Sequence, residues 1–253
     1  MNRFEGKTVL VTGGNSGIGL AAAQAFAKEG ARVVITGRDA ASLEAARATL
    51  GTVGSHAALA IRNETGTVAA ARDLARQLQE AGVRLDAVFI NAGMAKFAAV
   101  ADVDEALWDA TFNANVKGAF FQIQALLPIL NAGTSIVLNG SINARIGMPN
   151  SSVYAASKAA LISLAKTLSG ELLSSGIRVN VVSPGPVSTP IYGKLGLDAD
   201  TLAATAAQIQ SQIPLGRFGQ PAEIAATVLH LSAPESAFIV GTEIIADGGM
   251  SQL

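Results

Sequence analysis

The chain contains no cysteine, and this absence excludes several kinds of site at once. Disulfide bonds, thiolate zinc sites, iron–sulfur clusters and a cysteine nucleophile all require that residue. Histidine is scarce as well, because His56 and His230 are the only two in 253 residues. We therefore expect no metal site built on histidine.

Charge is the second scarcity. Only 15% of the residues are charged, the net charge is −1, and lysine and arginine form no cluster. Binding of nucleic acid or of an anionic membrane needs a basic surface, so neither partner is predicted. Residues 118–144 lack charge, but their glutamines, asparagines, glycines and proline favour a buried helix, a turn and a strand over a membrane span. No apolar signal segment precedes the first predicted strand, and we expect a soluble, cytoplasmic protein.

Hydrophobic residues make up half of the chain and alternate between strand and helix patterns from end to end. Such alternation indicates right-handed βαβ units, a parallel sheet covered on both faces and one α/β domain over residues 1–253. The predicted strands are residues 8–11, 32–36, 57–61, 87–90, 135–138, 178–182 and 243–245. The predicted helices are residues 18–29, 40–49, 67–81, 104–130, 152–174 and 221–232.

Residues 184–219 depart from this pattern, because they are rich in glycine and proline and contain one helical segment at 199–213. A long insertion after the carboxyl end of a strand often covers a ligand crevice. We predict a substrate lid at about residues 186–216, with a static surface loop as the alternative.

A glycine-rich turn joins the first strand to the first helix. Glycines at this place allow a tight turn and let a pyrophosphate approach the positive end of the helix. The turn therefore predicts nucleotide binding. The residues expected to contact the nucleotide are Gly13, Asn15, Ser16, Gly17, Ile18 and Gly19.

The end of the second strand carries the signal for the choice of dinucleotide. An acidic side chain here usually binds the ribose hydroxyls of NAD, whereas this chain has Gly37 followed by Arg38. A planar guanidinium suits a 2′-phosphate, so NADP(H) is predicted over NAD(H). Two observations temper this: Asp39 offers a carboxylate nearby, and Ser16 stands where a second basic residue could help. Arg38 as an ordinary solvated loop arginine is the alternative.

Tyr154 and Lys158 lie four residues apart in a predicted helix, so both side chains share one face. A free tyrosine has a pKa of about 10, and acid–base work at neutral pH requires a shift of roughly 3 units, or about 4 kcal/mol. A unit charge ~5 Å away, at an effective dielectric of ~20, contributes about 3 kcal/mol. The lysine alone falls short, and a second cation such as an oxidised nicotinamide would complete the shift.

Taken together, the motifs resemble the classical short-chain dehydrogenase/reductase family over essentially the whole chain. The shared landmarks are Thr12-x-x-x-x-Gly17-x-Gly19, Asn91-Ala92-Gly93, Asn115, Ser141, Tyr154-x-x-x-Lys158 and Pro184-Gly185. The resemblance implies a Rossmann-type, doubly wound parallel sheet of about seven strands in three α/β/α layers. It also implies hydride transfer between nicotinamide and a carbonyl or alcohol.

By position, the resemblance gives each landmark a role. Tyr154 would be the general acid for ketone reduction, and Ser141 would hold the substrate oxygen. Lys158 would lower the pKa of Tyr154 and bind the nicotinamide ribose. Asn115 would position a proton-relaying water. The implied cofactor-binding residues further along the chain are Asn63 or Glu64 at the adenine, Asn91, Ala92, Gly93, Tyr154, Lys158, Pro184, Gly185, Val187 and, at the carboxamide, Thr189. In this family the long helices 104–130 and 152–174 pack against other subunits, so a homotetramer is predicted.

The residues flanking the predicted acid and lid are mostly apolar, which suggests a hydrophobic ketone or secondary alcohol as substrate. The expected substrate-binding residues are Ser141, Asn143, Arg145, Tyr154 and Tyr192. Arg145 could bind a substrate carboxylate or be a rim arginine in water. A 3-oxoacyl-carrier-protein reductase is the first alternative, although residues 131–135 and 174–176 lack the basic residues such a partner favours. A non-catalytic NADP(H)-sensing protein is the second alternative.

Overall fold

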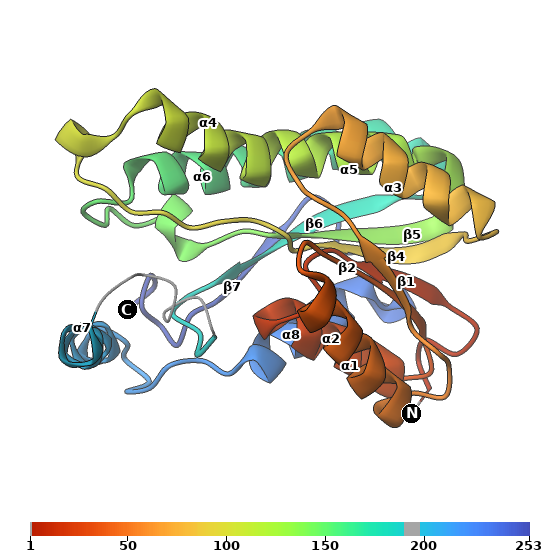
Figure 1. The fold of residues 1–253 in the computed structure, drawn as a ribbon, viewed down its shortest axis with the longest axis horizontal. Coiled ribbons are helices and arrows are strands. Elements are labelled where there is room, and N and C mark those ends of the chain that lie inside the picture. Colours follow the sequence, from red (N-terminus) through yellow and green to blue (C-terminus); the bar gives the residue numbers. More distant parts are fainter. Residues whose placement is uncertain (1, 190–197) are drawn as a thin grey trace.

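A computed structural model describes residues 2–189 and 198–253 of the chain. Seven parallel strands form a single sheet in the order β3-β2-β1-β4-β5-β6-β7 (Figure 1). The order reverses direction next to β1, which is the switch point at which such sheets bind ligands. The strands are β1 Thr8–Val11, β2 Arg32–Gly37, β3 Leu59–Arg62, β4 Leu85–Ile90, β5 Leu130–Asn139, β6 Arg178–Pro184 and β7 Glu243–Ala246.

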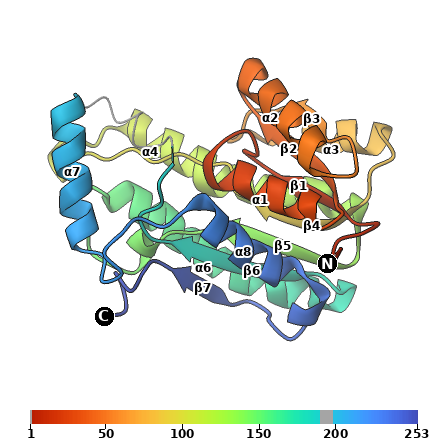
Figure 2. The ribbon, with the colours of Figure 1, turned by 90° about the horizontal axis from the view of Figure 1, so that it is seen from below.

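Helices cover both faces of the sheet, which confirms the predicted Rossmann-type, three-layer fold (Figures 1 and 2). The layer with α1 contains α1 Gly17–Lys28, α2 Ala40–Val53 and α8 Pro221–Ser232. The opposite layer contains α3 Val68–Glu80, α4 Glu105–Phe112, α5 Gly118–Leu126 and α6 Ser152–Leu172. Helix α7 Ala199–Ser211 lies apart from both layers, beside the C-terminal end of the chain (Figure 2).

Alternation along the strands divides the core into two clusters. In β1, Val9 and Val11 belong to the cluster under α1 and α8, whereas Leu10 belongs to the cluster under α3, α5 and α6. Successive side chains of a strand point to opposite faces, so a strand between two helical layers is apolar at every position. The buried, β-branched strands therefore fix the sheet on which the site is built.

One predicted helix is wrong in its form. Residues 104–130 were expected to be one helix, but α4 and α5 are separated by a π-helical turn at Asn113–Lys117. A 3₁₀ turn at Leu127–Ile129 follows, and β5 already begins at Leu130, five residues before the expected start. The other strands and helices agree with the expected ranges to within a few residues.

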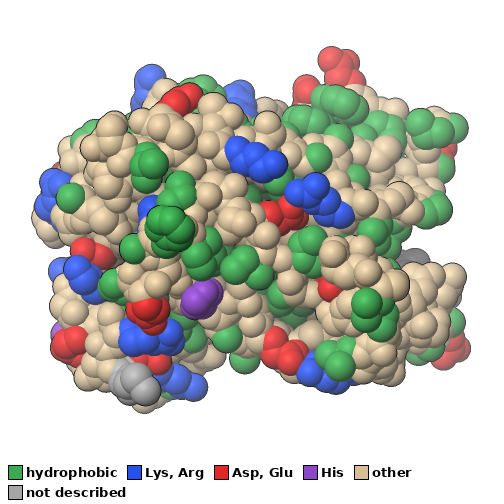
Figure 3. Space-filling view, turned by 180° about the vertical axis from the view of Figure 1, so that it is seen from behind, with side chains coloured by type: hydrophobic (Ala, Val, Ile, Leu, Met, Phe, Trp, Pro, Cys, Tyr) green, Lys and Arg blue, Asp and Glu red, His purple; other side chains and the backbone are tan. Residues whose placement is uncertain are grey.

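The surface carries no large patch of one charge on the face shown in Figure 3, where basic and acidic side chains are interspersed. Among the described helices, none has a stretch long and apolar enough to cross a membrane. Within the same residues, no group of three histidine or acidic side chains could hold a metal ion.

Candidate active site

The glycine turn lies at the switch point and is held there by Asn91, which follows β4. Asn91 Nδ2 donates hydrogen bonds to the carbonyl oxygens of Thr12 at 3.0 Å and Gly13 at 3.2 Å. A Cβ atom at Gly19 would lie only 2.2 Å from the Gly13 carbonyl oxygen, so this approach requires glycine. The turn is therefore a tight backbone cradle with Asn91 and Ala92 against it.

The first turn of α1 offers unused donors to this cradle. Ser16 is the N-cap residue, but its side chain makes no capping hydrogen bond. The N–H groups of Gly17, Ile18 and Gly19 have no partner one turn earlier in the helix, and they carry its positive end. A dinucleotide pyrophosphate suits this donor set, because it supplies the negative charge and the acceptors that are missing.

Two side chains at the tip of β2, Asp39 and Arg38, could bind the adenosine ribose or its phosphate, and their contacts differ. Asp39 is the N-cap of α2, and its Oδ1 accepts a hydrogen bond from the Ser42 N–H at 2.8 Å. Hydrogen bonds from the Ser42 side chain and backbone lower the pKa of Asp39. Arg38 is exposed at the same tip, and Asn15 packs over Gly37. The carboxylate is thus committed to the helix, which leaves the guanidinium to face a ligand.

The expected adenine residues at the end of β3 differ in position. Asn63 is buried, and its Nδ2 donates to the Ala70 carbonyl oxygen at 2.8 Å while its Oδ1 accepts from Gln122 at 3.3 Å. Its side chain is therefore used inside the fold. Glu64 is exposed at the strand end. Of the two, only Glu64 has a side chain available to a ligand.

Tyr154 and Ser141 meet at the carboxyl edge of the sheet. Ser141 follows β5 and is buried, while Tyr154 lies in the first turn of α6. Burial raises the pKa of Tyr154 above its usual value, and the hydrogen bond with Ser141 lowers it by less. Phe97 contacts the phenol ring edge-on, with centroids 5.6 Å apart. The two hydroxyl groups therefore lie together, with the aromatic ring of Phe97 against the phenol.

Lys158 is buried beside this pair, one helical turn after Tyr154. Its Nζ lies 5.7 Å from the centroid of the Tyr154 ring and donates a 2.7 Å hydrogen bond to the Asn139 carbonyl oxygen. Burial lowers the pKa of Lys158 from 10.5 to about 8. The groups of the protein alone leave Tyr154 a weaker acid than free tyrosine, so a lowering of its pKa by Lys158 and a cofactor stays a prediction.

Asn115 is buried within the π-helical turn and ties two segments together. Its Oδ1 accepts from the Met94 N–H at 2.8 Å, and its Nδ2 donates to the Met94 carbonyl oxygen at 3.0 Å and to Ser157 Oγ at 2.9 Å. A Cβ atom at Gly93 would lie 2.8 Å from Asn115 Oδ1 and 3.8 Å from Lys158 Nζ. Asn115 therefore lies near Lys158, with Gly93 between the two side chains.

The segment after β6 closes the other side of the site. The Gly185 N–H donates to the Ala246 carbonyl oxygen at 3.0 Å, and Val187 forms an isolated bridge with Gly219. Pro184 ends β6, and Thr189 is half-buried. The expected substrate residue Tyr192 and part of the predicted lid lie outside the described residues.

Arg145 and Asn143 are both bound to protein groups. Arg145 makes an ion pair with Glu243, whose side chain is only 7% exposed, and Glu243 also accepts a 2.6 Å hydrogen bond from Ser183. The Asn143 N–H donates to Ser141 Oγ at 3.2 Å. The ion pair favours a rim arginine over a group reserved for a substrate carboxylate.

Two further side chains lie at the site, and of these only Phe97 had not been singled out from the sequence. Phe97 contacts Tyr154, as described above, and Asn139 Nδ2 donates to Asn91 Oδ1 at 3.0 Å. The buried Asn139 Oδ1 has no hydrogen-bond partner among the described residues. In the sequence, Asn139-Gly140 precedes Ser141 where the family more commonly has a serine, a departure expected to affect the shape of the pocket and not the chemistry.

Known proteins resemble this chain over nearly its whole length. A family model described as enoyl-(acyl-carrier-protein) reductase matches residues 13–251. The 3-oxoacyl-acyl-carrier-protein reductase FabG of Thermotoga maritima is 37% identical over 254 residues, which covers 98% of this chain and 99% of that protein. A solved structure described as a short-chain dehydrogenase/reductase family protein is 39% identical, with a TM-score of 0.86 and coverage of 99% of this chain and 100% of the other.

A second solved structure is the RhlG/NADP active-site complex of Pseudomonas aeruginosa. It is 34% identical, has a TM-score of 0.90 and matches 99% of both chains. Matches of this extent and identity extend well beyond a shared fold. The chain therefore belongs to the short-chain dehydrogenase/reductase family, and it is an oxidoreductase.

Proposed function

We propose that the protein transfers a hydride between NADP(H) and a carbonyl or secondary alcohol, and that it reduces a hydrophobic ketone. The observation that carries this proposal is the contact between the Ser141 and Tyr154 hydroxyls beside the buried ammonium of Lys158. Two hydroxyls converging at the edge of the sheet can hold one substrate oxygen. One of them can also exchange a proton with that oxygen.

The chain's own groups divide the work as follows. When bound, the nicotinamide supplies or accepts the hydride. Ser141 donates a hydrogen bond to the substrate oxygen, and Tyr154 donates its phenolic proton to that oxygen during ketone reduction. Lys158 holds a positive charge near the phenol, while Asn115 fixes the loop after β4 through Met94. Gly185, Val187 and Thr189 would hold the carboxamide end of the cofactor.

A preference for NADP(H) is supported by the tip of β2. Arg38 is exposed, and Asp39 is committed to capping α2. A carboxylate in that role is poorly available for the ribose hydroxyls that distinguish NAD. The Pseudomonas aeruginosa relative is described as a complex with NADP, which also supports this preference.

The apolar groups near the acid support a hydrophobic substrate. Phe97 contacts Tyr154, Ile142 is buried next to Ser141, and Met148 lies against Asn143. An apolar wall of this kind stabilises a substrate by burial and excludes water from the reacting oxygen. Arg145, held by Glu243, adds no free positive charge for a substrate.

A 3-oxoacyl-carrier-protein reductase is the second candidate, because the Thermotoga maritima relative has that name. Docking of an acidic carrier protein would need a basic rim. The segments 131–135 and 174–176 contain no lysine or arginine, which places this candidate second.

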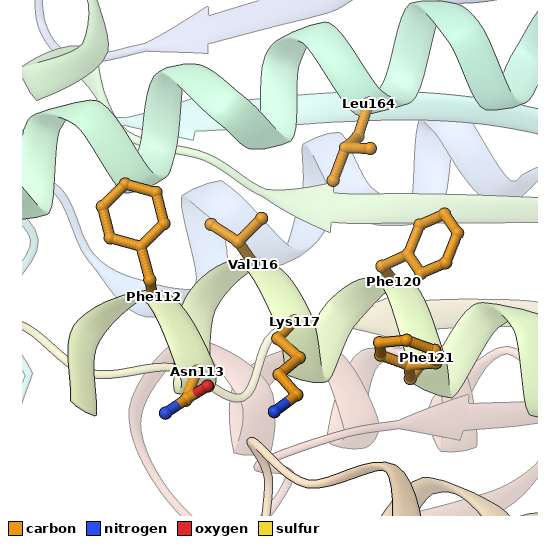
Figure 4. Close-up of a pocket in the computed structure, with 7 residues that line it drawn as sticks. All are labelled: Phe112, Asn113, Val116, Lys117, Phe120, Phe121 and Leu164. Atoms are coloured by element: carbon orange, nitrogen blue, oxygen red, sulfur yellow. The ribbon is translucent and has the colours of Figure 1, made fainter. Parts of the chain in front are cut away.

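Self-association is supported by an apolar stripe along α4, the π-helical turn and α5. Trp108, Phe112, Val116 and Phe120 are spaced four residues apart, and Trp108 is 47% exposed. Figure 4 shows three of these side chains directed towards α6, where Leu164 points back at them around a shallow cavity of about 280 Å³. Burial of such a stripe against another copy would stabilise an assembly, and a homotetramer is our proposal.

A panel of ketones tested with NADPH and NADH in parallel examines activity, cofactor and substrate size together. We expect oxidation of NADPH with apolar ketones. Tyr154→Phe should abolish this activity while cofactor binding persists. If Tyr154→Phe retains the activity, the catalytic proposal is wrong. If the wild-type protein binds NADPH but oxidises it with no ketone, a sensing role is favoured instead.

A further inference from the structure

Arg62 at the end of β3 lies next to the tip of β2. Its partner in the parallel register is Gly37, and its Nε donates a 3.1 Å hydrogen bond to the carbonyl oxygen of Arg38. This bond uses the inner nitrogen of the guanidinium. Among the described residues, neither terminal nitrogen of Arg62 makes a hydrogen bond, so the two-pronged end of the side chain is available.

The two arginines concentrate positive charge at this tip. Arg38 and Arg62 are both exposed, and neither forms an ion pair with any residue in 2–189 or 198–253. Besides Glu64, which follows Arg62 by two residues, the acidic side chain at these strand ends is Asp39. Hydrogen bonds from Ser42 and, to a smaller extent, the charge of Arg62 lower its pKa. Asp39 is bound to Ser42, and among the described residues neither Asp39 nor Glu64 forms an ion pair with Arg38 or Arg62, so both guanidinium groups remain available to an anion.

Small and polar groups form the floor below these arginines. A Cβ atom at Gly37 would lie 2.8 Å from Cγ of Asn15, so the asparagine packs directly on the strand tip. Asn15 Nδ2 also donates to Ser42 Oγ at 2.9 Å, which fixes its amide between the glycine turn and α2. A phosphate monoester carries about two negative charges and matches two planar guanidinium groups.

We infer that Arg62 binds the 2′-phosphate of NADP(H) together with Arg38 and is a determinant of the preference for NADP(H) over NAD(H). Arg62 supplies the second basic group that the glycine turn lacks at Ser16. Its anchored Nε sets the direction of the two free nitrogens, which lowers the entropy lost when they bind an anion. The inference rests on the proposed function.

The test uses ligand fragments and involves no hydride transfer. Adenosine 2′,5′-bisphosphate and adenosine 5′-monophosphate are titrated by calorimetry into the wild-type protein and Arg62→Gln. Arg62→Gln loses one charge-assisted contact, so its affinity for the bisphosphate should fall by about tenfold or more. Its affinity for the monophosphate should change by less than about twofold. Arg38→Gln should show the same selectivity. Arg32→Gln, at the opposite end of β2, removes an equal charge and should change neither affinity.

The outcomes separate this inference from the proposed function. Unchanged bisphosphate binding by Arg62→Gln, or equal weakening of both ligands, overturns the role of Arg62 and leaves the function standing if Arg38→Gln remains selective. If the wild-type protein does not prefer the bisphosphate, the proposed NADP(H) preference and the inference both fail. Should Arg62→Gln not fold, Arg62→Lys keeps the charge but loses the fork. It should weaken the bisphosphate selectively, and equal binding of the bisphosphate by Arg62→Lys and the wild-type protein would overturn the inference.

Discussion

The buried charge of Lys158 makes a quantitative prediction about stability. Its pKa is lowered from 10.5 to about 8 because burial penalises the ammonium. Lys158 is only 5% exposed, so little solvent screening offsets that penalty. A shift of that size corresponds to about 3 kcal/mol of folding free energy, at 1.36 kcal/mol per pKa unit. Lys158→Met keeps the length of the side chain and removes the charge.

The sign of the pH dependence follows from the two pKa values. Above pH 10.5 the amine is neutral in the folded and the unfolded chain, and it imposes no penalty. As the pH falls from 10.5 to about 8, the unfolded chain takes up a proton that the folded chain does not, so the folded state loses stability. Below about 8 both states are protonated, and the penalty stays constant.

The assay is urea unfolding of the wild-type protein and Lys158→Met at one protein concentration across pH 7 to 10. We expect the free energy of unfolding at pH 7 to be higher for the variant than for the wild-type protein. This difference should shrink by about 1 kcal/mol per pH unit above pH 8. The absolute gain will be smaller than 3 kcal/mol, because the hydrogen bond to Asn139 is also lost. If the unfolding free energies of the two proteins change with pH in parallel, the claim that Lys158 is charged and buried is wrong. The same variant should lose catalytic activity.

Three further substitutions test other parts of the structure. Asn115→Ala leaves the N–H and carbonyl of Met94 unpaired and should cost about 3 kcal/mol of unfolding free energy, and a cost below about 1 would contradict the anchoring role. Arg145→Met removes the ion pair to Glu243 and should lower the unfolding free energy by about 1 kcal/mol without a change in KM for neutral ketones. A KM increase confined to ketones bearing a carboxylate would instead show that Arg145 binds substrate. Phe120→Glu should dissociate the proposed homotetramer towards the 25.6 kDa chain in light scattering, and an unchanged mass would exclude this interface.

Much of the sheet could be predicted because its strands are short, buried apolar runs bounded by turn residues. The predicted first strand, residues 8–11, has the bounds of β1. The form of the helix over 104–130 could not be predicted, because its π turn depends on contacts with residues far away in the sequence. A Cβ atom at Gly118 would lie 2.8 Å from the Gly66 nitrogen, so the turn is fitted against the loop before α3.

The site shows the same division between local pattern and tertiary contact. Spacing alone brings Tyr154 and Lys158 to one helical face, and the structure places the two side chains together. The partner of Arg145 is 98 residues away on β7. Arg62 gains its place beside Arg38 only through the register of β2 and β3. No pattern in the sequence announces either pairing, because each depends on how separate elements align in the folded sheet.

The acidity of Tyr154 is the central claim, and ultraviolet titration of its phenol tests it most directly. The chain contains only two tyrosines, so the difference spectrum between the wild-type protein and Tyr154→Phe isolates this group. We expect the pKa of Tyr154 to lie above its usual value in the protein by itself, as burial dictates, and to fall when the positive charge of NADP⁺ is added. A phenol whose titration does not move with NADP⁺ would contradict the account.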